Sequence, residues 1–403
     1  MDSNCTRREW LKSASILGGA CLAGAPFARA VAVPAPAAPV SVARCRTYEP
    51  KELLPAMARM FDQLGRVGRL VKGKTVAIKF NLTGMPYFRL NNLSLAETHF
   101  TNPAVVGAAV NLIAKAGAAR IRVLESAWAT TDPIEEFLLQ ANLEPLDILG
   151  AAPNVEFENT NYLGKGKKYS RLMVPTGGYI YPGFDLNHSF ADCDVFVSIA
   201  KMKEHMTAGY TGAMKNCFGN APVTIDGDSA GVDEPSALPR DGRGDCFHDG
   251  KRQPSKSALQ EKDMHTPRLE TYRVPRIVVD LVAARPIHLA IVEGIKSMTA
   301  GEGPWAPGAA PCSPGVIVAG MNPVCTDAVA LALMNFDPMG DRGSPPFENT
   351  DSTLRLAEDI GIGTRDLKRI EVIGVPIKSA IFDFAKIRAA RRNPLQQQPG
   401  ARG

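Results

Sequence analysis

The segment Ala200–Pro222 (AKMKEHMTAGYTGAMKNCFGNAP) holds the densest group of side chains suited to chemistry in this sequence. Its lysines, and the backbone N–H groups left open near its glycines, suit phosphate or carboxylate anions. His205 suits acid/base catalysis or metal binding near neutral pH. A solvated basic loop with glycine turns is the competing interpretation. We expect catalytic roles for His205, Lys215 and Lys201, and substrate-binding roles for Lys203, Asn216 and Gly219.

Three further residues are candidates for substrate binding. Lys79 and Asn81 lie at and just after the end of the apolar run KTVAIKF, which the sequence predicts to be a buried strand. The Asn81 side chain can hold a substrate amide or hydroxyl, and a loop-capping Asn is the alternative. Gly303 lies in the turn Gly301–Pro304, where the backbone can approach a ligand closely.

Three carboxylates are candidate ligands of a divalent metal ion. Glu125 ends the run RIRVLE, Glu293 ends HLAIVE, and Asp327 lies in the first turns of a helix predicted from Pro323. Divalent cations prefer oxygen donors of this kind, and paired carboxylates also serve as general acids and bases. The alternatives are ordinary strand ends for the two glutamates and a favourable helix-dipole interaction for Asp327.

The elements that must position these residues are short apolar runs alternating with helix-forming segments. This alternation is typical of an α/β fold with a mostly parallel sheet covered by helices on both faces. Such sheets bind ligands at the carboxyl edge, where the candidate residues fall. Residues 223–273 are polar and form a long insertion, which is either a functional lid or disordered. Strands are expected at 74–80, 120–125, 155–157, 171–174, 194–200, 288–292, 316–319 and 370–373.

The N-terminus has the order of a secretory signal. Arg7 and Arg8 are followed by an aromatic residue, an apolar stretch and small residues up to Ala30, and this order resembles a twin-arginine (Tat) signal. An amphipathic first helix is the alternative. We therefore predict a periplasmic or exported protein that meets the Tat translocase during export. The predicted organisation is a signal peptide at 1–30, a Pro/Ala-rich linker at 31–45, one α/β domain at 46–383 and a basic flexible tail at 384–403.

The charge distribution argues against nucleic-acid binding. The net charge is +5, but the predicted signal holds four basic and two acidic residues, and the predicted tail holds five basic residues and no acid. Residues 31–383 therefore carry a net charge of −2, and aromatic residues make up only 7% of the chain. A basic stripe with interleaved aromatics is missing from the sequence. No apolar run reaches the roughly 18–20 residues needed to cross a bilayer, so no membrane span is predicted.

The cysteine spacing limits the choice of cofactor. Cleavage after Ala30 leaves six cysteines, no two of them within ten residues of each other. They form neither a CxxC pair nor a ferredoxin run, so an iron–sulfur cluster bound by this chain is not expected. Disulfide pairing stays open. The six are Cys45, Cys193, Cys217, Cys246, Cys312 and Cys325.

Five segments agree, in order, with one known family. They are Val76–Leu82 (VAIKFNL), His99–Ser126, Asp194–Pro222, Ile291–Pro304 and Val316–Pro338. Together they resemble the bacterial and archaeal family called domain of unknown function 362, whose activity is not established. Many relatives carry ferredoxin-type cysteine motifs, which this chain lacks, so their iron–sulfur label is not carried over. The family-typical residues are Lys79, Asn81, Glu125, Lys201, Lys203, His205, Lys215, Asn216, Gly219, Glu293, Gly303 and Asp327.

Two functional hypotheses follow. The first is an exported protein with a cleft of lysines, a histidine and carboxylates, which performs metal-assisted chemistry on an anionic small molecule. The alternative is a non-catalytic cofactor-binding or maturation partner of an exported redox enzyme. Twin-arginine export of folded chains fits both, and the sequence leaves open whether the protein is an enzyme.

Overall fold

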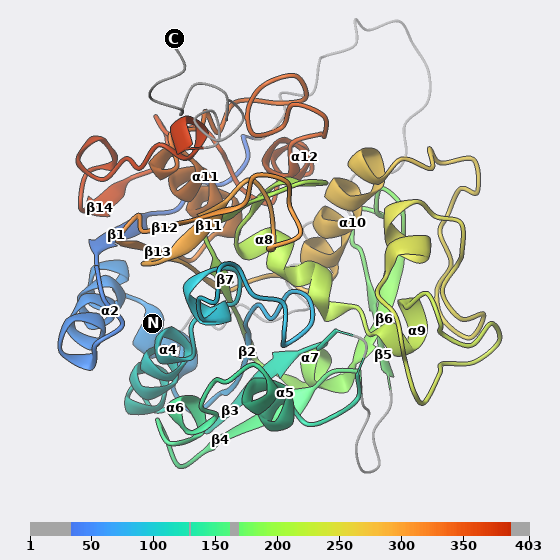
Figure 1. Cartoon of the computed structure of the whole chain (residues 1–403), viewed down its shortest axis with the longest axis horizontal. Helices are drawn as coiled ribbons and strands as arrows, with labels where there is room; N and C mark the ends of the chain where they lie inside the picture. The colour runs from blue at the N-terminus through green and yellow to red at the C-terminus, as the bar shows by residue number, and fades with distance from the viewer. Residues whose placement is uncertain (1–33, 129, 162–168, 388–403) are drawn as a thin grey trace, which may run out of the picture. The chain divides into compact units, whose positions relative to one another are not determined.

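Short runs of Val, Ile, Leu and Ala form an eight-stranded sheet, because such side chains pack well when both faces are covered. The computed structural model describes residues 34–128, 130–161 and 169–387 (Figure 1). The strand order is β14-β1-β13-β10-β7-β2-β3-β4, and of these eight strands only β13 runs antiparallel to the rest. The bounds are Val40–Arg44 (β1), Thr75–Lys79 (β2), Arg120–Glu125 (β3), Val155–Asn159 (β4), Val195–Lys201 (β7), Leu289–Gly294 (β10), Val316–Gly320 (β13) and Val372–Gly374 (β14).

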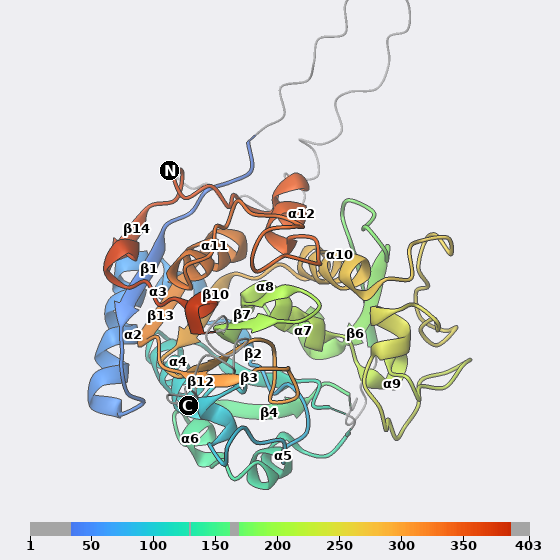
Figure 2. The ribbon, with the colours of Figure 1, turned by 45° about the horizontal axis from the view of Figure 1, so that its top comes forward.

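Helices cover both faces of this sheet and divide its apolar side chains into two cores (Figure 2). In β7, Val197 and Ile199 belong to one core, whereas Phe196 belongs to the other. The predicted fold class, a mostly parallel sheet with helices on both faces, is therefore confirmed. One core includes α2 (Pro50–Leu64), α3 (Val67–Val71), α4 (Pro103–Lys115), α5 (Ile134–Gln140) and α6 (Leu146–Leu149), and the other α7 (His188–Asp192), α8 (Ala213–Asn216), α10 (Glu270–Ala284), α11 (Pro323–Leu333) and α12 (Thr353–Asp359).

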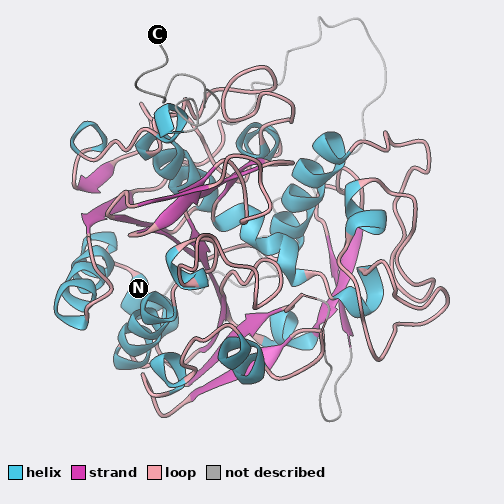
Figure 3. Ribbon diagram, viewed as in Figure 1, coloured by secondary structure: helices cyan, strands magenta, loops and turns pink. Residues whose placement is uncertain are grey.

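Three short antiparallel ribbons and several single turns lie outside the central sheet. The predicted strand at 171–174 belongs to one of these ribbons and not to the sheet. Figure 3 shows that much of the polar insertion runs as loop. The ribbons pair β5 (Tyr169–Met173) with β6 (Gly183–Asn187), β8 (Lys203–His205) with β9 (Gly209–Thr211), and β11 (Ser297–Thr299) with β12 (Ala310–Cys312); the turns are η1 (Leu95–Glu97), η2 (Cys217–Asn220), α9 (Val223–Asp226), η3 (Gly244–His248) and η4 (Ile377–Ser379).

The predicted linker and tail differ in part from the structure. Residues Val40–Arg44, expected in the linker, form β1, because their backbone pairs with β13 and β14 while Val40 and Val42 are buried in a core. Phe384, the first residue of the predicted tail, is fully buried in a core. The predicted signal and the tail beyond residue 387 lie outside the described residues. The described residues from Ala35 onward form one compact unit.

The helices of the described ranges are all too short or too polar to cross a membrane. In α4, as the sequence predicts, Asn102 accepts a hydrogen bond from the Ala104 N–H at 3.0 Å and Pro103 occupies the first turn.

Close packing of α4 against α6 depends on Gly107. A Cβ at this position would lie 2.0 Å from the backbone oxygen of Asp147. We expect Gly107→Ala to lower the free energy of unfolding by about 1–3 kcal/mol, because the backbones must move apart. Denaturant unfolding measures the change, and Gly68→Ala is the matched control, since a Cβ at Gly68 meets open space. Equal unfolding midpoints for the two variants would contradict this packing.

Candidate functional site

Four neighbouring parallel strands bring acidic and basic side chains to one edge of the sheet. Lys79, Glu125 and Lys201 are the last residues of β2, β3 and β7, and Glu293 is the penultimate residue of β10. Parallel strands end at the same edge, and the register places Glu293 directly beside Lys201. The edge therefore holds two acid–base pairs. One lies on the neighbouring strands β2 and β3, and the other on β7 and β10.

Lys201 and Glu293 form a buried ion pair that lies outside the cavity lining. The Lys201 amine also donates to the backbone oxygens of Ala96 at 2.8 Å and Lys296 at 3.0 Å. Glu293 accepts from the backbone N–H of Asn102 at 3.1 Å. Burial lowers the pKa of Lys201, and the Glu293 carboxylate opposes that shift. The amine of Lys201 and the carboxylate of Glu293 therefore have their hydrogen-bond partners within the protein.

Lys79 and Glu125 form a second buried ion pair, 2.8 Å long, and both line the cavity. Lys79 donates to the Asn216 side-chain oxygen at 2.8 Å, and Glu125 accepts from the Leu82 N–H at 2.8 Å. Burial lowers the pKa of Lys79, while Glu125 raises it. A Cβ at Gly219 would lie 2.8 Å from Glu125 Oε1 and 3.0 Å from Lys79 Nζ. Glycine at this position lets the backbone approach the pair.

Asp327 positions the short helix α8 instead of lining the cavity. Its buried carboxylate accepts hydrogen bonds from the backbone N–H groups of Ala213 at 2.7 Å and Met214 at 3.0 Å. Lys215 and Asn216 follow directly in the same helix. Asp327 therefore holds the turn that presents these two residues to the cavity.

Lys203 lies buried beside the cavity without an ion-pair partner among the described residues. Its amine donates to the side-chain oxygen of Asn81 at 3.2 Å and to the backbone oxygens of His99 at 2.7 Å and Glu302 at 2.8 Å. Burial lowers the pKa of Lys203 well below its usual value. The amine thus joins three segments, of which Asn81 and Glu302 reach the cavity lining.

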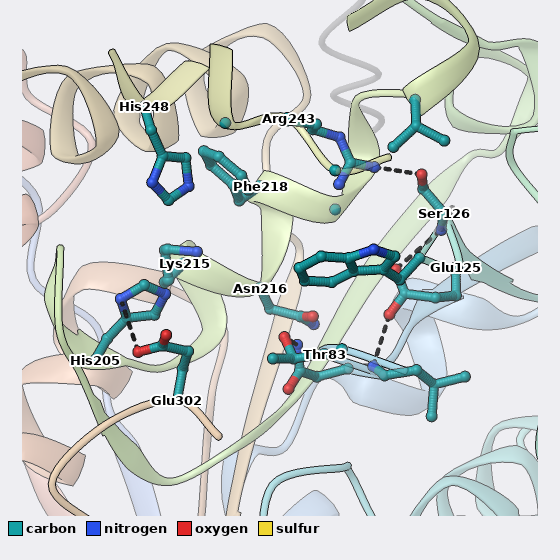
Figure 4. A pocket seen from close by; sticks show the side chains of 18 of the residues that line it. Thr83, Glu125, Ser126, His205, Lys215, Asn216, Phe218, Arg243, His248 and Glu302 are labelled. Carbon is teal, nitrogen blue, oxygen red and sulfur yellow. Dashed lines mark hydrogen bonds and ion pairs between the residues drawn. The ribbon is translucent and has the colours of Figure 1, made fainter. Parts of the chain in front are cut away.

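The cavity itself has a volume of about 300 Å³ and lies at the carboxyl edge of the sheet (Figure 4). The structure brings together at its lining seven predicted residues: Lys79, Asn81, Glu125, His205, Lys215, Asn216 and Gly219. It places the other five outside the lining: Lys201, Lys203, Gly303, Glu293 and Asp327. The lining residues without a predicted role include Ser126, Trp128, Phe218, Asp228, Arg243, His248, Glu302 and Trp305.

The Lys215 amine faces this cavity and has no hydrogen-bond or ion-pair acceptor within the described part of the chain. It lies 4.2 Å from the centre of the Phe218 ring. Burial lowers the pKa of Lys215 to about 7. The Glu302 carboxylate opposes this shift, whereas the positive charges of Arg243 and Lys79 add to it. The amine is therefore both a cation and a proton acceptor near neutral pH.

His205 and Glu302 lie together beside Lys215 (Figure 4). His205 Nδ1 accepts from the Thr207 N–H at 3.2 Å and lies 3.5 Å from Glu302 Oε2. Burial lowers the pKa of His205 well below its usual value, and the Glu302 carboxylate opposes that shift. Burial would raise the pKa of Glu302, but His205 and the N–H donors of Met206 and Trp305 hold it at about 2. Glu302 therefore stays ionised at neutral pH.

Arg243 reaches the cavity from the polar insertion. Its Nε donates to the Ala221 backbone oxygen at 2.7 Å, and an Nη atom donates to the Ser126 hydroxyl. It has no carboxylate ion pair with any described residue. Its flanking residues, Gly242 and Gly244, are the one signal in the sequence that marks Arg243, because glycines let a backbone approach a site closely.

Gly303 does not expose its backbone to the cavity, because the ring of Trp305 fills the space beside it. A Cβ at Gly303 would lie 2.2 Å from that ring. Trp305 and Trp128 both line the cavity, and the chain holds only one other tryptophan, Trp10. Their rarity in the sequence was a usable signal for both residues.

The predicted metal ligands have separate partners in the structure. Glu125 contacts Lys79, Glu293 contacts Lys201, and Asp327 accepts backbone hydrogen bonds, so the three do not share one site. Among the described residues, no group of three or more His, Cys, Asp or Glu side chains is arranged to hold a metal ion. A metal role for these acids stays a prediction. The six described cysteines are free and buried.

The Lys201–Glu293 pair provides a test of its structural role. We expect Lys201→Met to lower the free energy of unfolding by about 3–5 kcal/mol, because it leaves a buried carboxylate unpaired. Lys201→Met/Glu293→Leu restores part of that loss in a double-mutant cycle measured by urea unfolding. Lys256→Met is the control, since its ion pair with Asp233 is exposed. Additive effects of the two buried substitutions would refute the coupling.

A family model described as "Domain of unknown function (DUF362)" matches residues 76–332. The "Thylakoid-associated protein sll1697" of Synechocystis sp. is 29% identical over 189 residues, which cover 45% of this chain and 50% of that protein. The chain therefore spans about half the length of this curated relative.

Two solved structures have only a distant likeness. A protein from Thermotoga maritima has 14% identity and a TM-score of 0.32, over 62% of this chain and 51% of its own. The lactate racemase apoprotein from Thermoanaerobacterium thermosaccharolyticum has 11% identity and a TM-score of 0.34, over 68% of this chain and 54% of its own. Scores this low support no inference about function. The family match, in contrast, covers well over half of the chain, and the protein belongs to the DUF362 family.

Proposed function

We propose that the cavity binds a small carboxylate- or phosphate-bearing molecule, and that Lys215 and His205 perform acid/base chemistry on it. One observation carries this proposal. Lys215 and Arg243 line the same cavity, and neither has a carboxylate ion-pair partner among the described residues. Two cations that form no carboxylate ion pair, in one partly buried space, favour an anion.

The other charges of the lining support this proposal. Lys79 is neutralised by Glu125, so it does not compete for the ligand. Asp228 accepts hydrogen bonds from the backbone N–H groups of Gly244 at 3.1 Å and Asp245 at 2.8 Å. Glu302 is likewise held by two N–H donors, from Met206 at 2.9 Å and Trp305 at 2.7 Å. Each of these carboxylates is satisfied without Lys215 or Arg243.

Acid/base chemistry follows from the position of Lys215. An amine whose pKa is about 7 exchanges protons readily at neutral pH, and it lies beside the imidazole of His205. Arg243 keeps its charge and would orient the anion through its fork of N–H donors. A metal-assisted form of the reaction stays a prediction, and adding divalent ions to the assays below tests it.

Anion binding is tested with cyclohexanecarboxylate and inorganic phosphate by calorimetry. We expect Lys215→Met and Arg243→Met each to weaken binding by roughly tenfold or more, because each removes a charge-assisted hydrogen bond. Lys256→Met, at an exposed site outside the cavity, should bind as the natural chain does. Unchanged affinity in both cavity variants would overturn the proposal.

The affinity should also depend on pH. Lys215 is protonated below its pKa of about 7, so carboxylate binding should be strongest there and weaken as the pH rises through that value. The ligand carboxylate stays ionised from about pH 6 to about pH 9, so the change reports the protein. In Lys215→Met the pH dependence should disappear. A natural chain whose affinity is constant across this range would contradict the assigned role of Lys215.

We also propose export by the twin-arginine route, which rests on residues 1–30 of the sequence. Arg7→Lys/Arg8→Lys should retain the uncleaved chain in the cytoplasmic fraction, whereas the natural chain should appear in the periplasm without residues 1–30. Arg29→Lys is the control, because it changes a basic residue of the same segment outside the arginine pair. Equal periplasmic amounts of both variants would rule out this route.

A further inference from the structure

Two tryptophans belong to the lining of the cavity, on loops that begin far apart in the sequence. Trp128 follows β3, and Trp305 lies between β11 and β12. Both line the cavity, yet Trp128 is 39% exposed and Trp305 is 38% exposed. Large aromatic side chains contribute most when their faces are covered, so two partly uncovered indoles at one cavity need a reason.

The Trp305 ring is held in a fixed orientation. Its indole N–H donates to Glu302 at 2.7 Å, and the Phe88 ring packs edge-on against it with the centroids 5.8 Å apart. A Cβ at Gly84 would lie 2.7 Å from the ring, and one at Gly303 2.2 Å. Two glycines thus make room for this indole, which is the arrangement of a preformed aromatic wall and not of a loose surface side chain.

Trp128 extends the aromatic lining beyond the cavity. It also lines a second cavity of about 220 Å³, whose apolar side chains include Met85, Tyr87 and Phe137. Tyr87 is itself exposed and packs edge-on against Phe88, with the ring centroids 5.2 Å apart. Aromatic and apolar side chains therefore continue from the first cavity past Trp128 into the second.

We propose that the ligand of this cavity is an aromatic anion, whose ring is held by Trp305 and Trp128 while Lys215 and Arg243 hold its carboxylate or phosphate. The inference rests on the proposed function for the anionic end and adds the class of the ligand body. Stacking on a preorganised indole costs little conformational entropy, which favours a flat ring over a flexible aliphatic group.

Four probes separate the ring from the charge: benzoate, cyclohexanecarboxylate, benzamide and cyclohexanecarboxamide. We expect benzoate to bind about three- to tenfold more tightly than cyclohexanecarboxylate, the gain of an aromatic contact beyond buried area. Benzamide, which keeps the ring without the charge, should bind more weakly than benzoate. Phenyl phosphate compared with cyclohexyl phosphate repeats the test for a phosphate. Calorimetry and quenching of tryptophan fluorescence measure the affinities.

Variants of the natural chain assign the effect to the two indoles. Trp305→Leu and Trp128→Leu should each reduce the preference for benzoate over cyclohexanecarboxylate, measured as the ratio of the two affinities in the same variant. Trp305→Phe keeps an aromatic face and should keep most of the preference, which guards against a loss caused by misfolding. Leu238→Ala is the matched control, because Leu238 is exposed and lies outside the cavity lining.

Each outcome has one meaning. Equal affinity for benzoate and cyclohexanecarboxylate, both tighter than benzamide, overturns the aromatic inference and leaves anion binding standing. Equal affinity for benzoate and benzamide overturns the anion proposal and leaves the aromatic site. A failure of all four probes and of phenyl phosphate to bind overturns both. A benzoate preference that survives both Leu substitutions overturns the assignment to Trp128 and Trp305.

Discussion

Burial of lysine amines at the carboxyl edge of the sheet is the constraint on which the rest of the structure depends. Lys79, Lys201 and Lys203 are almost fully buried there, and a buried charge without partners is very costly. Two of the lysines are paired with carboxylates from neighbouring strands. The third is held by an amide oxygen and two backbone oxygens. These contacts tie the loops around the cavity to the sheet.

The same constraint separates scaffold from site. Lys201 and Glu293 satisfy each other and the surrounding backbone, so they hold the edge together without reaching the cavity. Lys215 lies on a short helix that Asp327 fixes by two backbone hydrogen bonds, and its amine is left facing open space. A rigid surrounding that leaves one cation unsatisfied is suited to binding an anion, since the protein need not rearrange to receive it.

Sequence reasoning located the edge of the sheet but not the whole cavity. Lys79 and Glu125 were recognisable because each ends an apolar run, and parallel strands end together. Lys201 and Glu293 share that pattern, yet their side chains form an ion pair away from the cavity. Strand position alone does not reveal which side chain points inward. Arg243 was missed because the glycines on either side of it do not indicate, within a long polar segment, that the chain folds back to the cavity there.

The sequence by itself determined the fold class and the chemical character of the strand ends, because apolar periodicity and residue type are local properties. It also determined which family the chain resembles, through segments preserved in order. Only the tertiary structure decided which charges are cancelled. Lys79 and Lys203 are unavailable to a ligand because each is held by an acceptor more than forty residues away in the sequence. Lys215 is available because none of the described residues offers its amine an acceptor. Such pairings are set by packing in space and not by any spacing along the chain.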